Sequence, residues 1–559
     1  MTVRVLLTLF VATSLTACAA PPPSPAVASD PAAAPVKPGA DDAAEDAADW
    51  WAHVSFLATD EMRGRETGSP EHRKAANYVA DQLTRAGVQP AGSNGFMQPV
   101  TFRSRKIDES KSSLTLVRKG KEMPLLLGDD ATFGMRIDAA PHVEAPLVFA
   151  GHGLSIPEAG HDDFAGLDVR GKVVVYLAGS PRAVPGALSA HYQSAGERWA
   201  TLKRLGAVGI IAVANPKSMD VPWERSAANR LNPAMALADA SLDETAGQQL
   251  SVTFNPARAE RLFEGSGHTF AEVLKVADEG TALPRFPLAA SVRATVSVDS
   301  QMVESQNVAG IVRGRDAAFA DEFVVLTAHL DHVGIGAAIN GDAIYNGAMD
   351  NASGIATLLE AAKAVVEARP KRSVVFVAVT AEEKGLLGSR YYALNPTVAR
   401  DGIVANINMD MFLPLFPLKT LMVLGLDESD LGDDVRATAT AMQIEVQADP
   451  EPQRNRFIRS DQYSFIREGV PALAMKVGYD EGSPQATVAA EWTRERYHGP
   501  ADDLDQPIDR TAAADFTRLI GELCVRIANR DSRPQWKAAS FFKRFARPAT
   551  SETTAAPNR

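Results

Sequence analysis

Cysteine is almost absent from this chain, which has two cysteines among its 559 residues. Cys18 lies close to the N-terminus, and Cys524 falls in an apolar helical pattern at residues 516–527. A disulfide framework and a thiolate metal site are therefore both excluded as sources of stability. Long apolar runs are missing as well, because no segment stays apolar for the roughly 18–20 residues that a membrane span requires.

Positive charge is also in short supply. Lys and Arg number 57 and Asp and Glu number 69, so the formal net charge is −12 at pH 7. Because a phosphate backbone is bound by concentrated Lys and Arg, we expect no nucleic-acid partner. The chain is long enough for two or more domains, and its 45% hydrophobic and 23% charged residues are typical of a globular protein.

The N-terminus has the pattern of an export signal. Arg4 precedes a short apolar run, and small residues then lead to Cys18, which is typical of a bacterial secretory signal peptide. The ending Leu15-Thr16-Ala17-Cys18 resembles a lipobox, so we expect a signal peptide at residues 1–17 and a lipid on Cys18. Ala19 after the cysteine resembles outer-membrane sorting. The expected location is thus the bacterial cell envelope, lipid-anchored in the outer membrane and facing the periplasm.

Composition divides the rest of the chain into blocks. Residues 18–48 nearly lack large apolar side chains, so they cannot offset the entropy of ordering and are expected to form a disordered tether rich in Ala and Pro. From about residue 307, near-continuous apolar strands alternate with helical patterns. This alternation predicts an α/β fold whose mixed, largely parallel sheet is sandwiched by helices. The predicted blocks are a main domain in two parts (49–133 and 296–536), an inserted β-rich α/β block (134–295) and a C-terminal tail (537–559).

Metal-binding side chains follow the predicted strands of the main domain. In open α/β sheets, sites form at the carboxyl ends of the strands. The candidates are His329, Asp331 and His332 after the strand at 323–328, Asp350 at the start of the helix at 353–368, Glu382 and Glu383 after the strand at 373–379, Asp410 after the strand at 403–409, and His498 in a later loop. Two imidazoles and three carboxylates, one of which can bridge, would hold two divalent ions about 3.5–4 Å apart. Nitrogen and oxygen donors without thiolate favour zinc, with cobalt or manganese as substitutes.

The adjacent carboxylates Glu382 and Glu383 indicate a second kind of chemistry. Adjacent side chains at the end of a strand point in different directions. One carboxylate can therefore bind a metal while its neighbour faces the substrate as a general base. In a hydrolytic two-metal site, such a base takes a proton from water and returns it to the leaving group.

Taken together, these motifs resemble those of the di-zinc exopeptidase family, which contains the bacterial leucyl aminopeptidases and the glutamate carboxypeptidases. The resemblance rests on residues 64–69, 329–331, 347–354, 382–389, 408–411 and 497–498. In organisation it spans about residues 50–529. The inserted block at 134–295 resembles the protease-associated (PA) domain that several members of the family carry.

The resemblance implies a role for each candidate residue. It makes Asp350 the ligand that bridges two Zn²⁺ ions, with a cis peptide bond between Asp350 and Asn351. The ligands that complete the two sites are His329 and Asp410 for one ion, and Glu383 and His498 for the other. The resemblance also makes Glu382 the general base and Tyr479 the residue that stabilises the tetrahedral oxyanion. It implies that Asp331 supports the far ring nitrogen of His329, and that Asp502 supports that of His498.

Two further positions lie beside these motifs. His332 follows the first metal motif, and we expect it to form part of the wall or to support a ligand rather than to bind metal. Gln462 stands where many relatives have His, and a glutamine cannot change its charge near neutral pH. Substrate contact or ligand support at this position is therefore expected to differ from that in relatives.

The expected function is that of a zinc-dependent aminopeptidase that removes N-terminal residues from short peptides. A carboxypeptidase of the glutamate carboxypeptidase type stays open, because Arg454, Arg456 and Arg459 lie where such relatives place substrate-binding arginines. Alternatives of another class are a glutaminyl cyclase-like transferase, whose relatives keep one zinc, and a non-catalytic binding protein. The complete set of ligands together with Glu382 favours the peptidase. The sequence does not indicate the oligomeric state.

Overall fold

The computed structural model describes residues 40–219, 221–454 and 456–547, and these fall within one compact unit of the chain. The predicted signal peptide, Cys18 and most of the predicted tether lie outside the described residues. Among the residues that are described, no helix combines the length and the hydropathy needed to cross a membrane.

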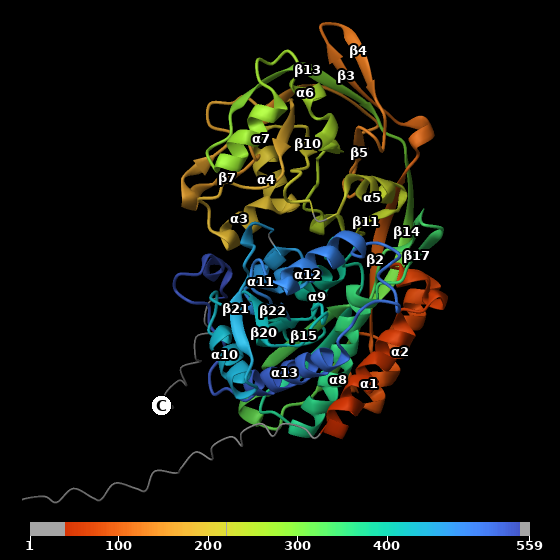
Figure 1. The fold of residues 1–559 in the computed structure, drawn as a ribbon, viewed down its shortest axis with the longest axis vertical. Coiled ribbons are helices and arrows are strands. Elements are labelled where there is room, and N and C mark those ends of the chain that lie inside the picture. Colours follow the sequence, from red (N-terminus) through yellow and green to blue (C-terminus); the bar gives the residue numbers. More distant parts are fainter. Residues whose placement is uncertain (1–39, 220, 455, 548–559) are drawn as a thin grey trace, which may run out of the picture. The chain divides into compact units, whose positions relative to one another are not determined.

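A ten-stranded mixed sheet forms the centre of the main domain (Figure 1). Its order is β11-β2-β14-β18-β15-β19-β22-β20-β21, and the short β1 pairs with β14. The strands are β1 (Gln89–Pro90), β2 (Met97–Ile107), β11 (Ala234–Leu237), β14 (Val298–Val312), β15 (Phe323–His329), β18 (Ser373–Val379), β19 (Ile403–Asn408), β20 (Thr420–Leu424), β21 (Glu445–Ala448) and β22 (Ala472–Val477). The central run β18-β15-β19-β22 is parallel. The predicted α/β fold with a mixed sheet is confirmed.

Helices cover both faces of this sheet, because its central strands are apolar on both sides. Along β15, Val324 and Leu326 belong to one buried cluster and Val325 to another, as the two-residue period of a strand requires. The first cluster is shared with α1 (Ala40–Leu57), α2 (Pro70–Arg85), α8 (Ser353–Ala368), α10 (Leu431–Ala441) and α13 (Arg510–Ala528). The second is shared with α9 (Leu387–Leu394) and α11 (Gln462–Arg467). Each fully buried Val or Leu contributes roughly 1.5–3 kcal/mol.

A second, eight-stranded sheet has its own core. Its order is β4-β3-β13-β6-β9-β10-β12-β5. The strands are β3 (Ser113–Arg118), β4 (Lys121–Leu125), β5 (Ala131–Phe133), β6 (His142–Ala150), β9 (Val173–Leu177), β10 (Gly209–Val213), β12 (Leu250–Phe254) and β13 (Arg285–Thr295). Helices α4 (Ala195–Leu205), α6 (Glu260–Phe263) and α7 (Phe270–Glu279) pack on it. The remaining elements are β7 (Ser155–Ile156), β8 (His161–Asp162), β16 (Gly334–Ile339), β17 (Asp342–Tyr345), α3 (Gly186–Gln193), α5 (Trp223–Ala228) and α12 (Pro484–Glu495).

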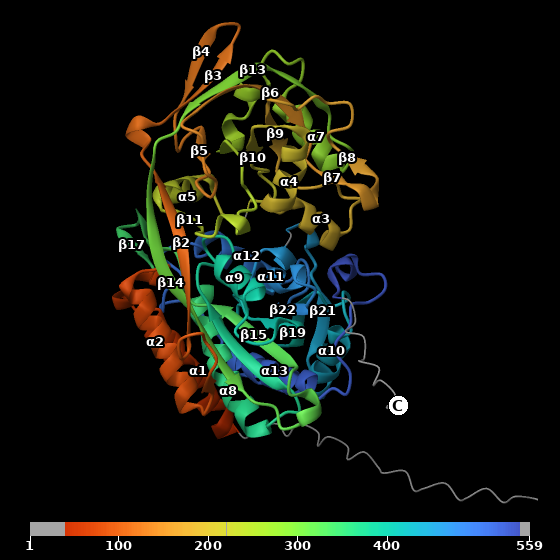
Figure 2. The same cartoon turned by 180° about the vertical axis from the view of Figure 1, so that it is seen from behind.

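The strand pairing differs in two places from the predicted boundaries of the inserted block. β3, β4 and β5 precede residue 134 yet pair in the second sheet, whereas β11 falls inside the predicted block but pairs with β2 of the main sheet. Figures 1 and 2 show why: the long strands β2 and β14 extend from the main sheet toward the second one. The chain therefore changes sheets between β2 and β3, and again between β13 and β14.

The N-terminal end of the described chain is more ordered than predicted. α1 begins at Ala40, so residues 40–48 of the predicted tether are helical. Alanine is the best helix former, and Trp50, which has no exposed surface, anchors the following turn in the core. At the other end, the turn Phe541–Phe545 packs through the buried side chain of Phe542, within the predicted tail.

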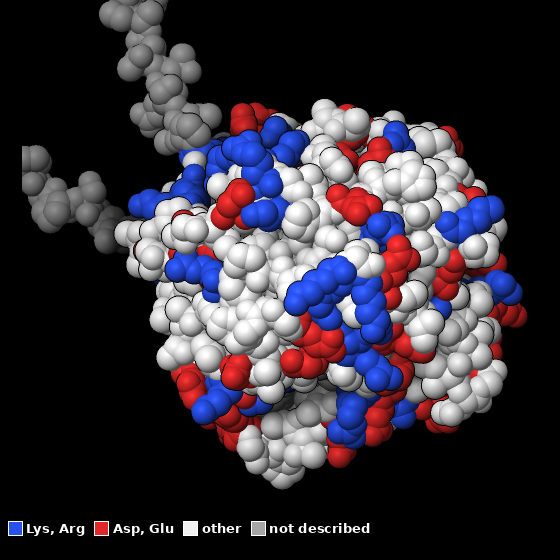
Figure 3. All heavy atoms as spheres, turned by 90° about the horizontal axis from the view of Figure 1, so that it is seen from above, with Lys and Arg blue, Asp and Glu red and all other residues white. Residues whose placement is uncertain are grey.

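The surface carries charges of both signs. On the face shown in Figure 3, Lys and Arg are interspersed with Asp and Glu. Arg293 of β13 is an example of local pairing, because it contacts Glu122 at 2.5 Å and Glu144 at 2.9 Å. Exposed pairs of this kind contribute little to stability, about 0–1 kcal/mol each.

Candidate metal centre

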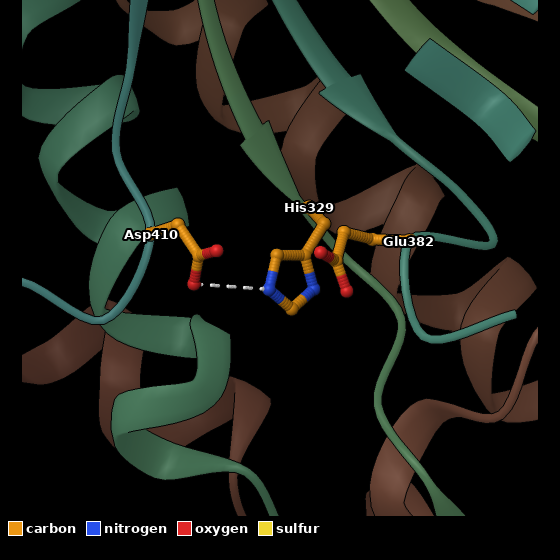
Figure 4. Close-up of side chains that lie close together, drawn as sticks. All are labelled: His329, Glu382 and Asp410. Atoms are coloured by element: carbon orange, nitrogen blue, oxygen red, sulfur yellow. Dashed lines mark hydrogen bonds and ion pairs between the residues drawn. The ribbon is translucent and has the colours of Figure 1, made fainter. Parts of the chain in front are cut away.

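Three neighbouring parallel strands bring the first candidates to one edge of the main sheet. β15 lies between β18 and β19, and His329 at its end pairs with Val379 at the end of β18. Glu382 follows β18 and Asp410 follows β19. Because the carboxyl ends of parallel strands share an edge, these side chains meet there (Figure 4).

The first donor group surrounds His329, whose side chain is 1% exposed. Its Nε2 lies 3.1 Å from Oδ1 of Asp350 and 3.4 Å from Oδ1 of Asp410. In Figure 4 the imidazole lies between the carboxylates of Asp410 and Glu382. One donor atom from each of His329, Glu382 and Asp410 lies within 4.8 Å of the others.

Asp350 also faces a second donor group. It sits in a π-helical turn (Ala348–Ala352) that opens α8, and its bond to Asn351 is cis, as the family resemblance implied. Oδ2 of Asp350 is 3.2 Å from Nε2 of His498, which in turn is 3.1 Å from Oε2 of Glu383. Asp350 thus uses one oxygen toward each group.

The spacing of these donors fits metal ions. Donors at 2.0–2.2 Å from a tetrahedral zinc lie about 3.3–3.5 Å from one another. The four contacts among His329, Asp350, Asp410, His498 and Glu383 measure 3.1–3.4 Å. The structure therefore brings all five predicted ligands together, and the five fit a pair of divalent cations that share Asp350.

The charges of these groups strongly shift one another's pKa values. Burial alone would lower the pKa of the His329 and His498 imidazoles, but neighbouring carboxylates raise both well above the usual range. Burial would raise the pKa of Asp350, yet the two imidazoles hold it well below its ordinary value. At Glu382, burial raises the pKa well above the usual range, and nearby carboxylates add to the rise. Bound cations would act in the opposite sense on Glu382, because their charge favours the carboxylate.

The prediction that the Asp331 carboxylate holds the far ring nitrogen of His329 is wrong. Nδ1 of His329 instead lies 3.0 Å from the main-chain carbonyl of Asp331. The Asp331 carboxylate turns the other way and accepts hydrogen bonds from the main-chain N–H groups of Glu382 at 3.1 Å and Glu383 at 3.4 Å, and from the Thr67 hydroxyl at 3.0 Å. Asp331 therefore fixes the backbone that carries the two glutamates.

Asp502 also differs from its predicted role beside His498. Its carboxylate accepts hydrogen bonds from the main-chain N–H groups of Met349 at 2.9 Å and Asp350 at 3.0 Å. The side chain of Gln506 donates a third at 2.8 Å. Asp502 thus positions the turn that presents the bridging candidate Asp350.

Arg65 is a functional residue whose role the sequence did not reveal. Its guanidinium is 1% exposed and donates to four main-chain carbonyls, those of Leu57 (2.5 Å), Leu330 (3.0 Å), Asn346 (2.7 Å) and Gly347 (2.9 Å). The carbonyls of Leu330, Asn346 and Gly347 belong to the segments that carry His329 and Asp350, and that of Leu57 lies at the end of helix α1. In the sequence, the only indication of this role is the position of Arg65 in the motif at residues 64–69. Spacing does not reveal the four acceptors, because they are scattered along the chain.

The structure places Tyr479 in a cavity of about 790 Å³ that Asp410 also lines. Its main-chain carbonyl accepts from Gln447 at 3.0 Å, and its ring packs edge-on against Phe416. Tyr497 lines the same cavity and lies beside a candidate ligand, with its ring centroid 4.0 Å from that of His498. Burial raises the pKa of Tyr497 well above its usual range, and nearby carboxylates add to the rise. Tyr497 is therefore the tyrosine that directly adjoins the metal centre.

Gln462 supports the end of β19. Its Oε1 accepts from the side chain of Asn408 at 2.9 Å, and its Nε2 donates to the carbonyl of Phe457 at 3.0 Å. The Asn408 side chain accepts in turn from the Thr327 hydroxyl at 2.7 Å. Gln462 therefore fixes the strand from which Asp410 projects.

Replacing Asp331 by Asn tests the corrected role of this residue. One oxygen of the carboxylate becomes an NH₂ group, which meets main-chain N–H donors instead of accepting from them. We expect Asp331→Asn to weaken zinc binding about 10–100-fold, as loss of an outer partner does, measured by competition with a chromophoric chelator.

Thr67→Val is the matched control. It removes one hydrogen bond to Asp331 and leaves both contacts to the glutamate backbone, so the loss should be clearly smaller. Wild-type zinc affinity in Asp331→Asn would contradict this role.

Comparison with known proteins gives consistent matches. Residues 307–524 match the model of Peptidase family M28. The chain is 32% identical over 286 residues to a "Probable leucine aminopeptidase 2" of Aspergillus fumigatus, covering 48% of this chain and 53% of that protein. A probable leucine aminopeptidase 2 of Aspergillus oryzae is 30% identical over 244 residues, covering 41% of this chain and 46% of that protein. The matched part thus spans about half the length of these relatives.

Among solved structures, an aminopeptidase from Aneurinibacillus sp. strain AM-1 has a similar fold. It aligns with a TM-score of 0.52 at 19% identity, covering 85% of this chain and 92% of that one. The segment matched by the family model contains all five candidate ligands, from His329 to His498. That part of the chain, which contains the candidate metal-binding edge, is similar to Peptidase family M28.

Proposed function

We propose that this protein is a zinc-dependent aminopeptidase, which hydrolyses N-terminal residues from peptides at a two-metal site with Glu382 as the general base. The observation that carries the proposal is the convergence of His329, Asp350, Glu383, Asp410 and His498 at one sheet edge, with the Glu382 carboxylate beside them. The family match and the aminopeptidases among the relatives support the same conclusion.

The proposed chemistry divides between the cations and the chain. Two zinc ions act as Lewis acids that polarise the scissile carbonyl and make water a stronger acid. His329 and Asp410 would hold one ion, Glu383 and His498 the other, and Asp350 would bind both. Asp331 and Asp502 keep the backbone of these ligands in place through the N–H groups described above.

Glu382 is suited to move the proton. Its carboxylate is partly exposed toward a cavity of about 480 Å³ that Glu383 and His498 also line. A base in this position can accept a proton from the attacking water and deliver it to the amine that leaves. Burial raises the pKa of Glu382, whereas nearby cations would favour the carboxylate form that can accept a proton.

The surroundings of the site favour short peptides. The two cavities beside the donors share Tyr497 and Arg459. Residues from the predicted insert also line them, Trp223 in the larger and Arg136 in the smaller. A wall built from a second part of the chain limits how far a long peptide can extend past the metals.

The charges near the cavity favour an aminopeptidase over a carboxypeptidase. Nε of Arg454 contacts Glu451 at 2.8 Å, and Arg456 contacts Glu451 at 2.5 Å and Asp449 at 3.2 Å. The carboxylates of Glu451 and Asp449 offset the positive charge of these arginines, which a carboxypeptidase would need to bind the C-terminal carboxylate of its substrate. A cyclase with a single zinc and a binding protein without activity both fit less well, because the donor set is complete.

The N-terminal signal adds a proposed location. Signal cleavage before Cys18 and lipid attachment to it would anchor the peptidase in the outer membrane, facing the periplasm. The predicted insert, in this proposal, is a PA domain.

Activity on paired substrates tests the function. We expect leucyl dipeptides and leucyl p-nitroanilide to be cleaved, and the same compounds with an acetylated amine to resist cleavage. A chelator such as 1,10-phenanthroline should abolish activity, and added Zn²⁺ should restore it. Release of the C-terminal residue from a blocked peptide would instead identify a carboxypeptidase.

Replacing Glu382 by Gln tests the general base. Without a group that accepts the proton, kcat should fall about 10²–10⁴-fold. Zinc content, measured by mass spectrometry of the purified protein, should stay at the wild-type value.

Glu383→Gln is the matched variant one residue away, and it should lower zinc content as well as activity. Near-normal kcat in Glu382→Gln, or loss of zinc from it, would contradict the role of Glu382.

A further inference from the structure

His332 lies inside the metal centre. Its ring has no exposed surface, and its Nδ1 is 2.8 Å from Oε1 of Glu383 and 3.9 Å from Oδ2 of Asp350. These three residues form a second group whose donor atoms all lie within 4.8 Å of one another. The sequence predicted that His332 forms part of the wall or supports a ligand, and the structure places its ring against the candidate ligand Glu383.

The polar atoms of this group lack other partners. Neither ring nitrogen of His332 has a hydrogen-bond partner among the described residues, and neither has Oε1 of Glu383. The 2.8 Å contact between Nδ1 and Oε1 is short, but the two atoms are not aligned for a hydrogen bond. Leaving a buried polar group unsatisfied costs about 1–3 kcal/mol. A shared partner between these atoms would remove that cost.

Close contacts with neighbouring main-chain segments hold the imidazole ring of His332 in place. A side chain at Gly347, where φ is +64°, would meet Cγ of His332 at 2.5 Å and Cδ2 at 2.6 Å. The main-chain N–H of His332 also lies 3.4 Å from the carbonyl of Arg65. The imidazole therefore fills the space that the absent Cβ leaves, beside the turn that presents Asp350.

We propose that His332 is a sixth protein donor of this centre, binding through Nδ1 the same cation as Glu383 and His498. Nδ1 of His332 lies 2.8 Å from Oε1 of Glu383, and His332, Asp350 and Glu383 each offer one donor atom within 4.8 Å of the others. That ion then has four protein donors, and the one held by His329, Asp350 and Asp410 has three. The more completely coordinated ion should bind first when metal is limiting.

The inference rests on the proposed metal centre but does not depend on the substrate. Its test therefore reads metal binding in the full-length protein. If the protein binds cations normally but cleaves no peptide, the proposed function is contradicted and the role of His332 is not.

The first experiment compares His332→Ala with His152→Ala, a control that removes a buried histidine from the turn after β6. Loss of a direct donor should weaken the tighter of the two Co²⁺ or Zn²⁺ binding steps by more than the roughly 100-fold that loss of an outer partner costs. The control should bind both ions like the wild type. Unchanged affinity in His332→Ala, or a loss of no more than about 100-fold, would overturn the proposal.

The second experiment, His332→Cys, gives a gain of signal. The bond from sulfur to the metal, about 2.3 Å against about 2.0 Å for nitrogen, compensates for the shorter side chain. The Co²⁺-loaded variant should show a thiolate charge-transfer band in the near ultraviolet that the wild type lacks, because Cys524 is buried elsewhere. A folded variant that binds two Co²⁺ ions without this band would show that position 332 does not reach the metal.

Discussion

The balance of charge in one small pocket is the constraint on which the rest of the structure depends. Asp350, Glu382, Glu383 and Asp410 would carry four negative charges if all were ionised. Buried like charges at this spacing cost several kcal/mol each unless they are compensated. Two imidazolium groups would offset half of that charge, whereas two divalent cations with neutral imidazoles would cancel all of it. The raised pKa values of Glu382, His329 and His498 reflect the same concentration of negative charge.

The scaffold positions this pocket through hydrogen bonds to main-chain groups of the ligand-bearing segments rather than to the side chains of the ligands. Arg65 donates hydrogen bonds to four main-chain carbonyls. Asp331 accepts from the main-chain N–H groups of Glu382 and Glu383, and Asp502 accepts from those of Met349 and Asp350. A ligand on a fixed backbone loses little freedom when it binds a cation, so more of the binding energy is retained. Residues that do not themselves bind the metal therefore position the candidate ligands.

Much of the fold and the candidate ligands could be predicted because their signals are local. Continuous apolar strands reveal where β15, β18 and β19 end, and parallel neighbours must bring those ends together. The pairing of β11 with β2 was missed because a short strand carries no information about a partner far away in sequence. The helix from Ala40 was missed because its stability comes from Trp50 in the core, whereas the preceding residues lack apolar side chains.

The roles of Asp331 and Asp502 were beyond sequence reasoning for a related reason. Whether a carboxylate supports an imidazole or a main-chain N–H depends on side-chain direction at a loop, which spacing does not set. Stoichiometry of zinc in variants of Asp350 and Asp410 tests the central claim most directly. Two ions per chain in the wild type and one in Asp410→Ala are expected, and Asp350→Ala should retain fewer than two because Asp350 faces both donor groups. Two ions retained in Asp350→Ala would contradict the account.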